Sequence, residues 1–188
     1  QQLCCFRGRG RSGESTASVV MTGSVSTVDP AYAATPAERT LVLHLFDNLY
    51  RWTAEGAVPA AAHAYDCTDN EDGTQTYTFH LRRDGKWSDG SDLTAADFEY
   101  SWKRAASEAT AADYGYMFAG FEGYPNDLAV TATDDTTLEF TLTAPCAYME
   151  DLMAVPTFYP VKQSAVEAAD GWETSPGAWC QNAGFVSN

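Results

Sequence analysis

The chain has few basic residues and no long apolar run. Its 188 residues include 11 Lys and Arg against 26 Asp and Glu, which gives a formal net charge of −15. A surface of that sign repels the phosphates of nucleic acids and the headgroups of anionic lipids, so we expect no nucleic-acid binding. No apolar stretch approaches the ~18 residues that a membrane-spanning helix requires.

The chain also lacks the local patterns of common catalytic and metal sites. It has no GxSxG, P-loop or GxGxxG motif, which leaves hydrolase, kinase and dinucleotide-binding functions without support. The three histidines are scattered and form no HExxH motif or i, i+4 pair. The run Asp69–Gly73 resembles a calcium loop, but its first and twelfth positions would be Thr68 and Phe79 instead of acidic residues. We therefore expect no metal, no cofactor and no enzymatic activity.

Cysteine is present in an odd number and without CxxC spacing. This pattern fits neither a zinc knuckle nor a complete set of intrachain disulfides. The five residues are Cys4, Cys5, Cys67, Cys146 and Cys180.

The region around Trp87 predicts a strand, two turns and a capped helix. In Thr76–Leu81 apolar and polar residues alternate, as in a half-buried strand. Two Asp-Gly turns follow, with Trp87 between them as a large apolar anchor. Thr94 is placed to cap a helix, and Asp97 stands three residues later, where a capping-box acid complements the helix N-terminus. We expect the helix to begin at about Ala95.

This helix is predicted to bury one stripe and expose another. Phe98, Trp102 and Ala105 recur at i, i+4 and i+7 and would form the buried stripe. Glu99 and Lys103 are spaced for an exposed i, i+4 ion pair.

Elsewhere the sequence mixes helices and strands. A second capping box begins at Thr35, and the apolar period after it predicts a helix to about Arg51. Alternating runs over 128–132 and 138–142 predict a β-hairpin, and short helical stretches are expected over 148–154 and 161–169. Because no strict βαβ rhythm appears, we expect an α+β fold of mixed, largely antiparallel sheets with packed helices.

Taken together, these segments resemble the oligopeptide-binding receptors of ABC importers, the extracellular solute-binding proteins of family 5. The similarity covers about residues 18–185. The residues that carry it are Ser26-Thr27-Val28-Asp29-Pro30, Leu45-Phe46-Asp47-Asn48-Leu49, Phe79-His80-Leu81-Arg82, Lys86-Trp87-Ser88-Asp89-Gly90, Leu93-Thr94-Ala95-Ala96-Asp97-Phe98, Ser101-Trp102-Lys103-Arg104, Asp134-Asp135-Thr136-Thr137-Leu138-Glu139, Leu142-Thr143-Ala144-Pro145 and Trp172-Glu173-Thr174-Ser175-Pro176-Gly177.

The resemblance implies part of the first lobe of a type II periplasmic-binding-protein-like fold. Members of that family are much longer and have two lobes and a hinge, so the chain is expected to be a truncated N-terminal part. Residues 1–17, where arginines alternate with glycines, are expected to be a disordered tail, and 18–188 the partial lobe. The implied location is extracytoplasmic, in the periplasm or on the outer face of the membrane, with lipid anchoring as one option. The implied partners are an oligopeptide ligand and ABC permease subunits, with the receptor itself a monomer.

The resemblance also implies ligand-binding residues. In the family, the segment before the Asp-Pro turn lends main-chain donors and acceptors to an extended peptide, and an aromatic-rich loop after the Ser-Trp-Lys-Arg helix contributes a tyrosine. The corresponding residues here are Ser24, Val25, Ser26, Thr27, Tyr114 and, as second choice for the tyrosine, Tyr116. For either tyrosine the alternative is packing on its own lobe.

The same topology implies a disulfide between Cys146 and Cys180, since both regions run back toward the hinge. Two buried thiols are the alternative, because free cysteine is among the most buried residue types.

Two other functions stay open at this point. One is a receptor for another solute, such as nickel or an oligosaccharide, because specificity on this fold depends on the cleft. The other is an extracellular carbohydrate-binding or adhesion domain, suggested by five tryptophans and ten tyrosines on an acidic chain. A planar exposed row of aromatic rings would favour the latter.

Overall fold

The computed structural model describes residues 2–10, 13–21, 23–169, 177–181 and 185–188, with side chains from Gly23 onward. Residues 172–176 and 182–184, which include part of the resemblance, lie outside the described residues.

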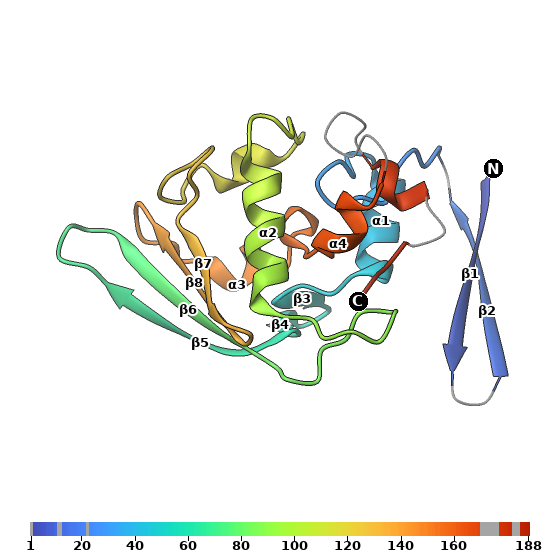
Figure 1. Ribbon diagram of the computed structural model, residues 1–188, viewed down its shortest axis with the longest axis horizontal. Helices are drawn as coiled ribbons and strands as arrows, with labels where there is room; N and C mark the ends of the chain where they lie inside the picture. The colour runs from blue at the N-terminus through green and yellow to red at the C-terminus, as the bar shows by residue number, and fades with distance from the viewer. Residues whose placement is uncertain (1, 11–12, 22, 170–176, 182–184) are drawn as a thin grey trace.

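At the N-terminus, strand β1 (Gln2–Gly10) pairs antiparallel with β2 (Gly13–Met21). This hairpin stands to one side of the other elements in Figure 1. It occupies the segment for which the sequence predicts a disordered tail, so backbone pairing exists where none was expected. Since β2 also crosses the expected boundary at residue 18, the division into tail and lobe stays a prediction.

Helix α1 (Pro36–Leu45) begins where the sequence predicts and ends earlier. Its capping box at Thr35 is confirmed, with proline at the first helical position. The expected end near Arg51 is wrong, because the chain becomes extended at Phe46 and then enters strand β3 (Tyr50–Thr53). Phe46 and Leu49, which follow the helix with helix-like spacing, are nevertheless buried, because the extended chain packs them into the core.

The main sheet consists of β5 (Ala62–Asp69), β6 (Gln75–Leu81), β7 (Val130–Asp134) and β8 (Thr137–Leu142). Its four strands are antiparallel and lie in the order β5-β6-β8-β7. Strand β3 pairs separately with β4 (Gly56–Pro59). The predicted strand over 76–81 and the predicted hairpin over 128–142 are both confirmed, as is the α+β class with antiparallel pairing.

Helix α2 (Ala95–Ala106) packs against β7 and β8 and covers one face of this sheet (Figure 1). Its predicted stripe of Phe98, Trp102 and Ala105 is buried, and the Trp102 ring meets the Phe140 ring of β8 edge-on at 5.2 Å. Trp87 is also buried in this core. The two tryptophans thus belong to one packed unit, as the sequence interpretation requires.

The start of α2 is held by one carboxylate. Asp97 Oδ2 accepts the backbone N–H of Thr94 at 2.8 Å and the indole N–H of Trp87 at 3.3 Å. The double turn is therefore tied to the helix that follows it. Glu99 and Lys103 form the predicted ion pair at 2.7 Å.

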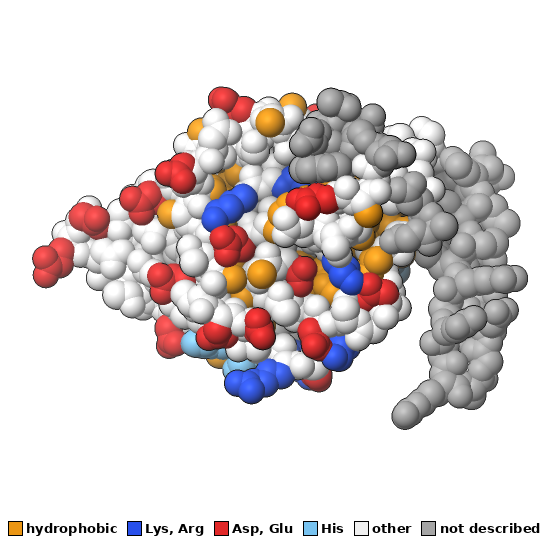
Figure 2. All heavy atoms as spheres, viewed as in Figure 1, with side chains coloured by type: hydrophobic (Ala, Val, Ile, Leu, Met, Phe, Trp, Pro, Cys, Tyr) orange, Lys and Arg blue, Asp and Glu red, His pale blue; other side chains and the backbone are white. Residues whose placement is uncertain are grey.

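The remaining elements are short: the 3-10 helix η1 (Gly115–Phe118), α3 (Met149–Leu152), the 3-10 helix η2 (Pro156–Phe158), α4 (Gln163–Glu167) and the 3-10 helix η3 (Ala178–Gln181). Of these, η1, η2 and α4 pack against α2, α3 packs against β3 and β4, and η3 packs against α4. The expected helical stretches over 148–154 and 161–169 are confirmed as shorter helices. Figure 2 shows acidic side chains spread over the visible face, with fewer basic ones among them, as the net charge requires.

Candidate ligand-binding site

The predicted backbone-donating segment, Ser24 to Thr27, belongs to no helix or strand and lies against the first turn of α1. Glu38 holds it there: its Oε1 accepts the Ser26 N–H at 3.0 Å and the Ser26 hydroxyl as well. The other oxygen, Oε2, accepts the Thr35 N–H of the helix cap at 3.0 Å. One carboxylate therefore joins the segment to the helix.

Glu38 is only 2% exposed, yet it carries its charge. Burial by itself would raise the pKa of this carboxyl, but hydrogen bonds from Ser26 and Thr35 hold it at about 2. Hydrogen bonds to the charged form account for such a shift. The anchoring of Ser26 is consequently a set of charge-assisted bonds, which are stronger than neutral ones.

The same segment leaves backbone groups free for a ligand. Within the described part of the chain, the carbonyl oxygens of Ser24 to Thr27 accept no hydrogen bond from another backbone N–H. Ser24 and Ser26 are exposed, while Val25 packs against Ala37 and Leu41 of the α1 region. A segment that is anchored on one side, with carbonyls that make no such bond among the described residues, can pair with an extended peptide chain.

The predicted tyrosines lie near α1, where Tyr114 contacts Arg39, the residue that follows Glu38. The Arg39 guanidinium carbon lies 4.8 Å from the centroid of the Tyr114 ring, a cation–π arrangement. The Tyr116 ring is 6.1 Å from that of Tyr114 and is 62% exposed, whereas Tyr114 is half-buried. Tyr114 is thus partly packed against its own lobe, whereas most of the Tyr116 side chain is free of such packing. Glu38 and Arg39 place both predicted elements at the start of α1.

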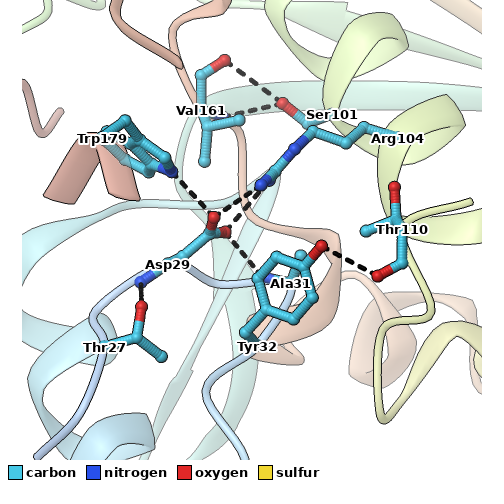
Figure 3. Close-up of polar contacts among 9 residues, drawn as sticks. All are labelled: Thr27, Asp29, Ala31, Tyr32, Ser101, Arg104, Thr110, Val161 and Trp179. Carbon is cyan, nitrogen blue, oxygen red and sulfur yellow. Dashed lines mark hydrogen bonds and ion pairs between the residues drawn. The ribbon is translucent and has the colours of Figure 1, made fainter. Parts of the chain in front are cut away.

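Behind the segment lies a buried polar cluster around Asp29, drawn in Figure 3. Asp29 is completely buried, and its carboxylate accepts both terminal guanidinium nitrogens of Arg104, at 3.1 and 2.6 Å. It also accepts the Trp179 indole N–H at 2.7 Å and the Ala31 N–H at 3.1 Å. The Thr27 hydroxyl oxygen accepts the Asp29 N–H at 3.0 Å, which fixes the end of the candidate segment.

The cluster extends to the loop that precedes Tyr114. The Tyr32 hydroxyl donates to the Thr110 carbonyl at 2.8 Å, and Arg104 lies over the Tyr32 ring at 5.5 Å (Figure 3). Burial would lower the pKa of Arg104, but the Asp29 carboxylate raises it above its usual value. A buried, hydrogen-bonded pair of Asp29 and Arg104 therefore connects the candidate segment, α2 and the tyrosine loop.

The expected disulfide does not form. Cys146 and Cys180 are both free thiols. The backbone N–H of Cys146 donates to Gln75 at the start of β6, whereas Cys180 is half-buried beside Thr27 and Val28. The expected pairing is absent from the structure because the two cysteines contact different segments of the chain. Burial raises the pKa of the Cys180 thiol to about 12, so it stays protonated and unreactive.

Sequence reasoning missed the residues that hold the site in place. The sequence explains Glu38 by capping or solvation and does not single out Arg39. Asp29 and Arg104 were quoted only as part of the resemblance. Both residues stand in runs that carry the family resemblance: Asp29 just before Pro30, and Arg104 near the end of α2.

The fold and this site define a class, that of the extracytoplasmic solute-binding proteins. The family model described as bacterial extracellular solute-binding proteins, family 5 Middle, matches residues 52–179. The chain belongs to this family.

Individual relatives agree with that assignment. The chain is 36% identical over 174 residues to the periplasmic oligopeptide-binding protein OppA of Escherichia coli, covering 86% of this chain and 31% of the relative. It is 30% identical over 191 residues to the oligopeptide-binding protein OppA of Bacillus subtilis, covering 93% and 35%. The chain spans about a third of the length of the curated relatives it matches.

Solved structures give the same result. OppA of Burkholderia pseudomallei superposes with a TM-score of 0.74 at 33% identity, over 86% of this chain and 32% of that one. OppA of Haemophilus influenzae, solved in complex with the peptide RPPGFSPFR, gives 0.74 at 30% identity, with the same coverage. Among the residues that the structure describes, no helix has the length and apolar character needed to cross a membrane.

Proposed function

We propose that this chain is the N-terminal part of the substrate-binding component of an ABC peptide importer, which captures oligopeptides and delivers them to a membrane permease. The single observation that carries the proposal is the segment from Ser24 to Thr27, in which Ser24 and Ser26 are exposed and Ser26 is anchored by Glu38. Several relatives are named oligopeptide-binding proteins, which supports the same ligand class.

Backbone pairing suits a receptor that must accept many sequences. Main-chain hydrogen bonds are common to all peptides, so a strand added beside Ser24 to Thr27 gains affinity without reading side chains. Glu38 contributes by occupying the Ser26 N–H and hydroxyl, which fixes the register of the segment before a ligand arrives. Pre-ordering of this kind lowers the entropic cost of binding.

The aromatic residues supply the second contact. Tyr116 offers a largely exposed ring, and Tyr114 is oriented by the guanidinium of Arg39. Tyrosine gives a rigid apolar surface with a polar tip, at a small cost in conformational entropy. We expect a bound peptide to lie between the Ser24 to Thr27 segment and these rings.

A second lobe completes the site in this proposal. In a two-lobed receptor, closure about a hinge encloses the ligand and adds contacts from the other side. The chain alone therefore binds peptides weakly or not at all, and the intact receptor binds them tightly. We further propose an extracytoplasmic, monomeric receptor, lipid-anchored or free in the periplasm.

The test is calorimetric titration of the intact receptor and of residues 1–188 with mixed di- to pentapeptides. We expect micromolar or tighter binding by the intact receptor and at least a hundredfold weaker binding by the chain alone. No heat from the intact receptor with any peptide would refute the peptide assignment, and micromolar binding by the chain alone would refute the need for a second lobe.

A matched pair of variants tests the aromatic contact. Tyr116 and Tyr148 are exposed to nearly the same degree, 62% and 63%, but Tyr148 lies just before α3 and outside the candidate site. Tyr116→Ala should weaken peptide binding by the intact receptor about tenfold, a typical loss for an aromatic contact. Tyr148→Ala should leave the affinity unchanged. Equal effects would exclude a specific role for Tyr116.

One alternative within the family keeps some support. A further relative, 35% identical, is named a probable deoxycholate-binding periplasmic protein of Escherichia coli, so another solute on the same fold is the second candidate. Titration with nickel, oligosaccharides and bile acids beside the peptides separates these options. The adhesion hypothesis is weaker, because three of the four tryptophans that the structure describes, Trp87, Trp102 and Trp179, are buried and Trp52 alone among them is exposed.

A further inference from the structure

Cys67 lies on β5, an edge strand of the main sheet with a neighbour on one side. Its partner across the strand pair is Tyr77 of β6. Residues directly opposite in an antiparallel pair place their side chains on the same face of the sheet. The Cys67 thiol, which is exposed and free, therefore stands beside the Tyr77 ring.

Cys146 reaches the same tyrosine from the loop after β8. The Tyr77 hydroxyl donates to the Cys146 carbonyl at 3.2 Å and lies 2.9 Å from Gln75 Oε1. The Cys146 N–H donates to that Gln75 oxygen at 3.1 Å. Two hydrogen bonds thus hold the loop over the start of β6, and Cys146 is half-buried and free there.

Both cysteines affect the pKa of Tyr77. Burial, a hydrogen bond with Cys67 and the nearby Cys67 and Cys146 sulfurs together raise the pKa of Tyr77 above its usual value. The Tyr77 hydroxyl therefore stays neutral and serves as a shared neighbour of the two sulfurs. Cys180, by contrast, is half-buried beside Thr27, a different part of the molecule.

We propose that Cys67 and Cys146 are a redox pair that closes to a disulfide across the end of the main sheet. Each thiol gives up a proton and a sulfur–sulfur bond forms, while the two electrons reduce a disulfide oxidant such as oxidised glutathione to two thiols. The reaction is a thiol–disulfide exchange through a mixed disulfide, which the exposed Cys67 would form first. An extracellular family member encounters the oxidising conditions under which such bonds persist.

The bond would secure the most exposed part of the sheet. Most of β5 is exposed, and its outer edge has no strand partner among the described residues, so its pairing to β6 opens more readily than the core. A cross-link from β5 to the Cys146 loop closes a chain segment of roughly 80 residues, and long closed loops gain the most from cross-linking. This inference does not depend on peptide binding.

Peptide mapping tests the pairing directly. Residues 1–188 are incubated with oxidised and reduced glutathione, alkylated in acid and digested with trypsin without reduction. Cleavage after Lys and Arg leaves Cys67 in residues 52–82, Cys146 in 105–162 and Cys180 in 163–188. We expect the 52–82 and 105–162 peptides to be covalently joined in monomeric protein, and the melting temperature to rise by several degrees on oxidation.

Three variants make the result decisive. Cys67→Ser, at an exposed position, should abolish both the joined peptide and the melting shift, and Cys146→Ser should do the same. Cys180→Ser should leave both unchanged. The proposal is overturned if 105–162 is joined to 163–188, if Cys67 is joined to Cys4 or Cys5 or to a second molecule, or if Cys67 is recovered mainly alkylated or as its glutathione adduct.

Discussion

The strongest stability prediction concerns the buried ion pair between Asp29 and Arg104. The Asp29 side chain is fully buried and that of Arg104 is 8% exposed, and two hydrogen bonds join them. Replacing Arg104 with leucine removes both bonds and the charge that balances Asp29. Among the described residues, the carboxylate then keeps the N–H donors of Trp179 and Ala31.

Breaking a buried pair by removing one partner costs about 3–5 kcal/mol, because the remaining charge stays desolvated. For a chain of this size, each 1 kcal/mol lowers the melting temperature by about 2–4 °C. Arg104→Leu should therefore lower the melting temperature by about 6–20 °C. Since domains are stable by about 5–15 kcal/mol, the loss is a large fraction of the total.

The adjacent residue on α2 provides the control. Lys103 also forms an ion pair, with Glu99 at 2.7 Å, but its side chain is 46% exposed. Lys103→Leu should cost less than about 0.5 kcal/mol, as exposed i, i+4 pairs do. Both variants are compared by urea unfolding followed through tryptophan fluorescence. If Arg104→Leu is no more destabilising than Lys103→Leu, the buried pair does not stabilise the fold as argued.

Three further predictions concern other parts of the molecule. Because the pKa of Glu38 is lowered from 4.5 to about 2, its stabilisation of up to about 3 kcal/mol is present above pH 4.5 and is lost as the pH falls to about 2. Unfolding of the parent and of Glu38→Gln across pH 2–6 should show the two stabilities converging at low pH; a constant gap would contradict the mechanism. Trp102→Phe should cost about 1–3 kcal/mol by urea unfolding, because the indole N–H that donates to the Phe158 carbonyl at 2.8 Å is lost and that buried acceptor is left unpaired; a neutral result would mean that the bond is dispensable. Gly123→Ala should lower the melting temperature far more than Gly73→Ala. Both glycines have positive φ, but a Cβ at Gly123 would lie 1.8 Å from a backbone oxygen, whereas a Cβ at Gly73 would meet nothing within 4 Å. Equal shifts in melting temperature would count against the close approach at Gly123.

The sequence by itself determined the local elements and the class of fold. The alternation in 76–81, the capping residues Thr35 and Thr94, and the stripe of α2 are readable because each depends on residues a few positions apart. The same local signals were misleading where packing took over: the apolar spacing after α1 continued beyond Leu45, although the chain had already become extended.

The tertiary structure decided what surrounds the candidate site. Asp29 meets Arg104 and Trp179 across 75 and 150 positions of the chain, and no local pattern encodes which distant donor a buried carboxylate will find. The cysteines illustrate the same point, since their neighbours followed from where the loop after β8 returned to the sheet and not from their spacing. Local hydrogen bonding and periodicity fix an element within a few residues, whereas the pairing of buried polar groups depends on how all the elements pack together.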